Sequence, residues 1–196
     1  MSKQYDFFKH KTPIKETSYD DAQSQYMTES DLEVIDFDKV KEEYIENLKL
    51  AEPPKSCDSL FFLDSNKKVF IEFKNGKVEL FNVRKKIYDS ILIYSDLTQC
   101  GISKTREEIE YILVYNYDAN KNNRNYISDP SRNIQETDGF KLFSDFVSKN
   151  AKEPILRFKL NDFKNYLVKN IYTYTSKEFE ENFINKFNSK TKKIGE

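Results

Sequence analysis

The chain has few of the residues that most often build metal centres and disulfide frameworks. Its 196 residues include two cysteines, Cys57 and Cys100, and one histidine, His10. These cannot supply the four Cys and His ligands of a structural zinc site, and two cysteines do not make a disulfide framework. Tryptophan is absent, so the aromatic part of the core must come from the 16 Phe and 13 Tyr residues.

Long apolar runs and an excess of one charge are also missing. No segment approaches the roughly 20 apolar residues of a membrane span, and residues 1–15 are polar, unlike a signal peptide. With 32 basic and 33 acidic residues the net charge is -1, so a nucleic-acid contact would have to come from a local patch. We therefore expect a soluble cytoplasmic protein with no membrane contact and leave its oligomeric state open.

The length of the chain is typical of one domain. Residues 1–30 are polar and show no clear apolar periodicity, which predicts a mobile or loosely docked lead-in. Residues 31–196 are predicted to form a single domain. Its core is expected at 34–117 and a C-terminal extension at 118–196.

Apolar spacing and turn residues predict helices at 34–50, 82–99, 140–149, 161–172 and 176–187, strands at 59–63, 69–74, 77–81, 111–117 and 154–160, and a polar loop at 118–135. Pro53 and Pro54 end the first helix, and Thr175 with Glu178 predicts a capping box for the last one. Helix, hairpin, helix and strand in this order indicate an α/β (α+β) fold. We expect a central mixed sheet flanked by helices, with extra helices at the C-terminus.

The strand predicted at 69–74 carries two charges in an otherwise apolar sequence. Side chains alternate along a strand, so Glu72 and Lys74 share a face with Phe70, while the other face is entirely apolar. Burying a carboxylate and an ammonium is costly unless they are paired, hydrogen-bonded or bound to a metal. These two charges therefore indicate a functional site.

A hairpin between this strand and the preceding one brings a second carboxylate to the same face. If the turn is centred near Asn66, Leu60 lies opposite Glu72 and Asp58 opposite Lys74. A slip of one residue would move Asp58 to the other face. In the favourable register the two carboxylates converge on a site that suits Mg²⁺, because Mg²⁺ keeps several waters and needs one or two protein carboxylates.

This arrangement resembles the PD-(D/E)xK phosphodiesterase superfamily, which includes restriction endonucleases and DNA-repair nucleases. Over about residues 34–117 a helix is followed by a strand beginning with Asp58, an apolar strand ending in Glu72-x-Lys74, a second helix and a strand. The resemblance implies a restriction-endonuclease-like core. It also implies that Asp58, Glu72 and the backbone carbonyl of Phe73 hold Mg²⁺ or Mn²⁺, and that Lys74 acts on the attacking water.

The resemblance points to further residues on the two helices. Many members add a glutamate from the first helix, and Glu33 would lie on its apolar face if that helix began early enough. On the second helix, Lys86 and Ser90 flank the apolar face and could reach the site. Weaker candidates, for contact with nucleic-acid phosphates, are Arg84, Lys85 and Arg124.

Our leading hypothesis is a Mg²⁺-dependent nuclease that hydrolyses phosphodiester bonds of DNA or RNA, with a metal to neutralise developing charge and a group to position water. The alternative is a catalytically silent module of the same fold that binds a protein partner, as in a toxin-neutralising, phage-related or defence-system protein. The near-neutral charge and the missing first-helix glutamate favour that alternative. A third hypothesis, nucleic-acid binding without catalysis, predicts an affinity that falls steeply with salt.

Overall fold

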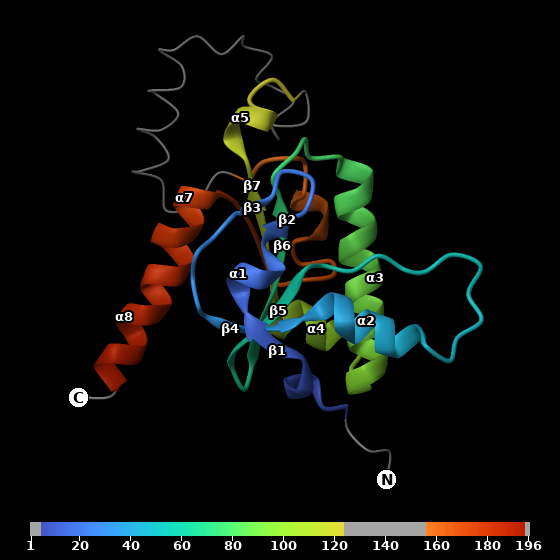
Figure 1. Cartoon of the computed structure of the whole chain (residues 1–196). Coiled ribbons are helices and arrows are strands. Elements are labelled where there is room, and N and C mark those ends of the chain that lie inside the picture. Colours follow the sequence, from blue (N-terminus) through green and yellow to red (C-terminus); the bar gives the residue numbers. More distant parts are fainter. Residues whose placement is uncertain (1–4, 124–155, 195–196) are drawn as a thin grey trace.

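A six-stranded mixed sheet forms the centre of the computed structural model, which describes residues 5–123 and 156–194 (Figure 1). In spatial order the strands are β1 (Lys11–Pro13), β4 (Glu33–Asp36), β5 (Ser59–Asp64), β6 (Lys67–Lys74), β7 (Ile109–Tyr115) and β8 (Asn170–Thr175). Strands β1, β4, β5 and β6 pair antiparallel, whereas β6, β7 and β8 pair parallel. The predicted mixed sheet is confirmed.

Helices cover both faces of this sheet (Figure 1). One face, with Leu60 and Phe70, packs against α2 (Phe37–Ile45), α3 (Leu80–Thr98) and α4 (Ile102–Glu108). The opposite face, with Phe61 and Ile71, packs against α1 (Ile14–Thr17) and a C-terminal helix made of α7 (Ser176–Phe179), the π-helical turn η3 (Glu180–Ile184) and α8 (Asn185–Ile194). Strand β6 is buried on both faces, which explains its apolar sequence.

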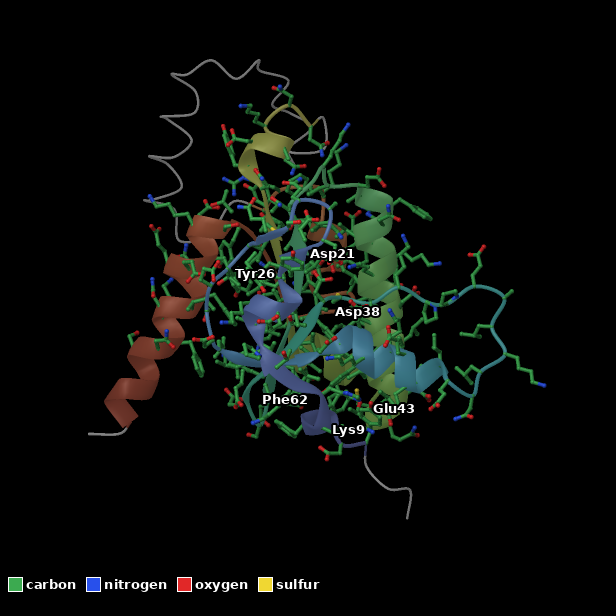
Figure 2. The ribbon with its side chains drawn as sticks, viewed as in Figure 1. Lys9, Asp21, Tyr26, Asp38, Glu43 and Phe62 are labelled. Carbon is green, nitrogen blue, oxygen red and sulfur yellow. The ribbon has the colours of Figure 1, made fainter. Side chains whose placement is uncertain are left out.

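The described part of the predicted lead-in, residues 5–30, forms secondary structure and pairs with the central sheet, and its mobility stays a prediction. It forms η1 (Phe7–His10), β1, α1 and a small hairpin of β2 (Tyr19–Asp20) and β3 (Gln25–Tyr26). Ile14 is fully buried. Lys9 and His10 both contact the Glu43 carboxylate on α2, His10 Nε2 at 2.8 Å (Figure 2). Periodicity does not reveal this segment, because each of its short elements buries at most one apolar side chain.

Two predicted elements around the hairpin were wrong. The helix predicted at 34–50 begins only at Phe37, because residues 33–36 form strand β4 between β1 and β5 and the Asp36 side chain accepts the first-turn amide of Lys39 at 3.1 Å. It ends at Ile45. The third strand predicted at 77–81 is not formed, since α3 already starts at Leu80.

The C-terminal half also departs from the prediction. The helix predicted at 161–172 is not formed: a 3₁₀ turn, η2 (Asn161–Phe163), irregular turns at 164–169 and the start of strand β8 take its place. The described end of the predicted strand 154–160 is irregular, because Phe158 and Lys159 have φ values of 61° and 50°, which an extended strand excludes. The predicted helix 140–149 lies outside the described residues.

The other segments agree more closely. The strand predicted at 111–117 is β7, displaced by two residues, and the helix predicted at 82–99 is α3. In the predicted polar loop, residues up to Asn120 form the short helix α5 (Tyr117–Asn120), and those from 124 on are outside the described residues. The last predicted helix continues to Ile194.

The capping box predicted for that last helix is confirmed and gives a stability test. The Thr175 hydroxyl accepts the Glu178 amide at 3.2 Å, and the Glu178 carboxylate accepts the Thr175 amide at 2.7 Å. Thr175→Ala is expected to lower the free energy of unfolding by about 1 kcal/mol, because a first-turn amide loses its partner. Urea denaturation measures this change. The control Ser176→Ala keeps the cap and should change little, so equal losses in both variants would contradict this role.

Candidate functional site

The β5–β6 hairpin brings Asp58 level with Glu72. Leu60 pairs with Phe70, so the predicted register was wrong by two residues. The turn, at residues 65–66, accounts for one residue of this shift, and a β-bulge between Phe62 and Asp64 accounts for the other. Because side chains repeat every two residues along a strand, a shift of two leaves Asp58 on the face of Glu72. The predicted sharing of one face therefore survives the register error.

Asp58 is held from three elements. Its Oδ2 accepts the Phe73 amide of β6 at 2.6 Å, and its backbone carbonyl accepts the Phe37 amide at the start of α2 at 3.1 Å. The preceding amide, of Cys57, donates to Ser90 Oγ on α3 at 2.8 Å. Ser90 therefore reaches the site as predicted, through the backbone next to Asp58. The Asp58 carboxylate is fixed in place and only 16% of its side chain is exposed.

Glu72 is a fully buried carboxylate at the centre of the sheet. Its side chain is 0% exposed and points to the face that α3 covers. Lys74 Nζ lies 2.7 Å from Oε1, and Lys86 Nζ lies 2.8 Å from Oε1 and 2.9 Å from Oε2. Two ammonium groups thus compensate the burial of this carboxylate.

Lys86 on α3 joins the two carboxylates. Its Nζ also donates to Asp58 Oδ1 at 3.0 Å. Since the oxygens of both carboxylates lie within 3.0 Å of one nitrogen, Asp58 Oδ1 and either Glu72 oxygen are at most about 6 Å apart. We call Asp58, Glu72, Lys74 and Lys86 the carboxylate–lysine cluster. The sequence suggested Lys86 as an auxiliary residue, and the structure places it at the centre.

Burial dominates the electrostatics of the cluster. Desolvation and the nearby Asp58 charge raise the pKa of Glu72 to about 7, against the opposing effect of Lys86 and Lys74. Desolvation alone would lower the pKa of Lys86, but the two carboxylates outweigh it and raise that pKa above its usual value. Burial raises the pKa of the Cys57 thiol well above its usual value, so this cysteine is not an activated nucleophile.

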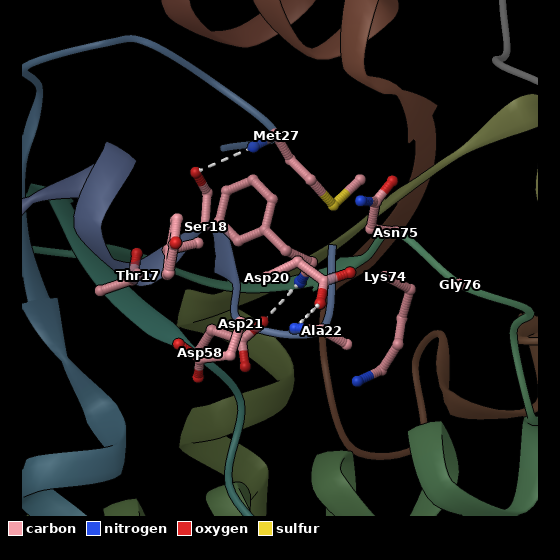
Figure 3. Close-up of a pocket in the computed structure, with 12 residues that line it drawn as sticks. Thr17, Ser18, Asp20, Asp21, Ala22, Met27, Asp58, Lys74, Asn75 and Gly76 are labelled. Atoms are coloured by element: carbon pink, nitrogen blue, oxygen red, sulfur yellow. Dashed lines mark hydrogen bonds between the residues drawn. The ribbon is translucent and has the colours of Figure 1, made fainter. Parts of the chain in front are cut away.

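A pocket of about 420 Å³ opens beside the cluster (Figure 3). Asp58, Phe73 and Lys74 line one side of it, and the β2–β3 hairpin, with Asp20 and Asp21, lines another. Asp20 and Asp21 were not predicted as site residues, because residues 1–30 show no apolar periodicity that would indicate a folded segment. Three carboxylates and one lysine make the pocket acidic, so it attracts cations.

The backbone of Phe73 is oriented toward this pocket. The N–H and C=O of one residue point to the same side of an extended strand. The Phe73 amide donates to Asp58, and the next carbonyl, of Lys74, accepts the Asn116 amide on the opposite side at 3.0 Å. The carbonyl of Phe73 is therefore directed to the side of Asp58. This direction is compatible with its predicted role as a metal ligand.

The oxygen atoms of the cluster suit a small hard cation such as Mg²⁺, but the position of Lys86 does not. Two carboxylates and one backbone carbonyl are the oxygen ligands that Mg²⁺ accepts while it keeps several waters. Among the residues that the structure describes, no group of three or more His, Cys, Asp and Glu side chains could hold a metal. Lys86 also lies between the two carboxylates, so a metal shared by them requires this side chain to move.

Glu33 does not lie on the first helix. It is the first residue of strand β4, its side chain is 69% exposed, and it pairs with Lys11 at 3.1 Å. The condition for its predicted role, an early helix start, is not met. The prediction failed because the apolar residues of β4 happen to continue the spacing of the helix that follows.

Of the predicted phosphate contacts, the structure gives partners for Arg84. Arg84 donates to the Asp162 carboxylate at 2.6 Å and to the Lys159 carbonyl at 3.2 Å, so its guanidinium ties α3 to the segment before β8. Lys85 is half-buried on α3. Arg124 lies outside the described residues. Contact of these residues with nucleic acid stays a prediction.

Comparisons with protein-family models, curated proteins and solved structures find no match. Along the chain the elements around the cluster follow in the order α2, β5, β6, α3, α4 and β7. In the described part of the chain, every helix is too short or too polar to cross a membrane. Because no related protein was found, the function of the site has to be inferred from the positions and contacts of its own residues.

Tyr111 gives a second stability test close to the cluster. Its hydroxyl on β7 is buried without a hydrogen-bond partner among the described residues, and burial raises its pKa well above the usual value. Tyr111→Phe is expected to leave the free energy of unfolding unchanged or raise it by about 1 kcal/mol, since an unsatisfied hydroxyl is removed. The control Tyr5→Phe removes a hydroxyl that donates to Glu43 at 2.9 Å and should lower it by a similar amount. A loss in Tyr111→Phe, measured by urea denaturation, would contradict the first expectation.

Proposed function

We propose that this chain is a divalent-metal-dependent phosphodiesterase of the PD-(D/E)xK type that hydrolyses DNA or RNA. The observation that carries the proposal is the convergence of Asp58, Glu72 and Lys74 on one sheet face, next to an acidic pocket. Each of these residues comes from the position that the motif requires. A buried glutamate on a central strand is costly, so its presence favours a functional role.

The role that we propose for each residue follows from how much of its side chain is exposed to the pocket. Asp58 and Glu72, with the Phe73 carbonyl, are the proposed ligands of the cation. When bound, the cation would neutralise charge on the phosphate and lower the pKa of a coordinated water. Lys74 is 28% exposed and lines the pocket, so its ammonium can donate a hydrogen bond to a water or phosphate oxygen there. Glu72 holds Lys74 in that position through their 2.7 Å ion pair.

The carboxylates that line the pocket would repel a negatively charged phosphodiester, so binding of such a substrate would need a metal cation. Asp20, Asp21 and Asp58 face this space with one lysine, Lys74. Like charges repel more strongly near a protein surface than in bulk water, so a phosphodiester would be disfavoured there without a cation. The proposed reaction thus depends on added Mg²⁺ or Mn²⁺.

A substrate panel tests this function. Purified full-length protein is incubated with end-labelled single- and double-stranded DNA and RNA in Mg²⁺, in Mn²⁺ and in EDTA. At least one substrate should be cleaved with a metal and none in EDTA. Cleavage that persists in EDTA, or no cleavage of any substrate with either metal, would contradict the proposal.

Two observations favour the catalytically silent alternative. Lys86 and Lys74 already balance the charges of Asp58 and Glu72, so the cluster is neutral without a metal. Helix α3 also exposes large apolar side chains, among them Phe81 at 78% and Leu92 at 61%, as protein-binding surfaces often do. Under this alternative the fold binds a protein partner and the cluster has a structural role.

A further inference from the structure

The ammonium of Lys86 fills the space that a shared cation would take. Its Nζ lies 3.0 Å from Asp58 Oδ1, 2.8 Å from Glu72 Oε1 and 2.9 Å from Glu72 Oε2. A Mg²⁺ ion bound to both carboxylates would lie about 2.1 Å from an oxygen of each, in the same region between them. The ammonium and the ion cannot both occupy it.

We propose that Lys86 is a built-in counter-ion that competes with the divalent cation for Asp58 and Glu72 and so weakens metal binding. This inference rests on the proposed function, because it concerns the same two ligands. With Lys86 in place the cluster of two carboxylates and two ammonium groups is neutral. Without Lys86 it carries a net charge of -1, which attracts a divalent ion more strongly, especially in a mostly buried site.

The surroundings allow Lys86, rather than the carboxylates, to move. Glu72 is fully buried on a central strand, and Asp58 is fixed by the Phe73 amide. The Lys86 side chain is 17% exposed and has four rotatable bonds, while its backbone is fixed in α3, where its carbonyl accepts the Cys57 thiol at 3.8 Å. A rotamer change of Lys86 therefore frees Asp58 Oδ1 and Glu72 Oε2 without moving the fold.

Metal affinity in matched lysine variants tests the inference. Free Mn²⁺ is measured by electron paramagnetic resonance while it is titrated into full-length wild type, Lys86→Met, Lys86→Gln and Lys85→Met. The Lys86 variants are expected to bind Mn²⁺ about 10-fold more tightly than wild type, or to bind it where wild type does not. Lys85→Met, on the same helix, should behave as wild type. Adding Asp58→Asn to Lys86→Gln should abolish the gain. Equal or weaker affinity in the Lys86 variants would overturn the inference.

A second measurement uses the wild type and so does not depend on the variants folding. Lysine acetylation with a limiting reagent, read by mass spectrometry, should modify Lys86 faster in Mg²⁺ than in EDTA, with Lys85 unchanged. No difference at Lys86 would count against displacement.

The outcomes separate this inference from the proposed function. If Lys86→Gln binds Mn²⁺ and wild type neither binds it nor cleaves nucleic acid, the inference holds and the proposed function fails. If wild type cleaves with metal but the Lys86 variants bind Mn²⁺ no better, the inference fails and the function stands. If no variant binds Mn²⁺ and wild type does not cleave nucleic acid with either metal, both fail.

Discussion

The Asp58→Asn variant is expected to lose metal-dependent cleavage by about 100-fold or more while it remains folded. The amide replaces an anionic ligand with a neutral one of nearly the same shape, and its oxygen can still accept the Phe73 amide that now bonds to Asp58 at 2.6 Å. A loss of about 100-fold corresponds to about 3 kcal/mol of transition-state stabilisation, within the range that a metal supplies. Initial cleavage rates in Mn²⁺ give the measurement.

A remote aspartate provides the matched control for this substitution. Asp118, on α5, is 82% exposed and pairs with Lys121 at 3.2 Å, outside the lining of the acidic pocket. Asp118→Asn should cleave at the wild-type rate. Circular dichroism and thermal unfolding of both variants show whether the fold is kept. If Asp58→Asn cleaves as fast as Asp118→Asn, Asp58 is not a ligand in the reaction.

Glu72 is expected to make the protein less stable as the pH rises from 4.5 to 8. Its pKa is raised from 4.5 to about 7, chiefly by burial and by Asp58, so the folded state binds a proton that the unfolded state has released. The contribution of protonated Glu72 is fully present below pH 4.5 and is lost as the pH rises through about 7. The size of the shift corresponds to about 3 kcal/mol.

The difference between wild type and Glu72→Gln isolates this effect, because glutamine does not titrate and other groups largely cancel. Urea denaturation at pH 4.5 and pH 8 should show the wild type losing about 3 kcal/mol of unfolding free energy relative to the variant. Parallel pH profiles for the two proteins would show that Glu72 does not have a raised pKa in the folded state.

The cluster could be predicted from the sequence because its signal is local. Strand alternation placed Glu72 and Lys74 on one face, and Asp58 joined them despite a register error of two residues. Helical geometry likewise put Lys86 and Ser90 within reach of the site. These predictions use periods of two and 3.6 residues, which need no knowledge of the rest of the fold.

What the sequence did not predict depends on distant contacts. The pocket wall at Asp20 and Asp21 forms because the N-terminal segment packs across the sheet, and no local pattern encodes that packing. The predicted helix 161–172 overlaps the start of strand β8, although residues 171–175 alternate β-branched and aromatic side chains. The apolar spacing of these residues fits the end of a helix as well as a strand, and their pairing with β7 makes them a strand. The ion pairs of Lys86 depend on the relative placement of α3 and the hairpin.

The most direct test of the central claim is the rate of Mn²⁺-dependent nucleic-acid cleavage by two lysine variants. Lys74→Met removes the ammonium that lines the pocket beside Glu72, whereas Lys77→Met removes an exposed lysine three residues later in the same segment. Lys74→Met is expected to cleave about 100-fold or more slowly than wild type, as for other groups that act on the reacting water. Lys77→Met should retain the wild-type rate. Equal rates for the two variants, both folded, would contradict a catalytic role for the cluster.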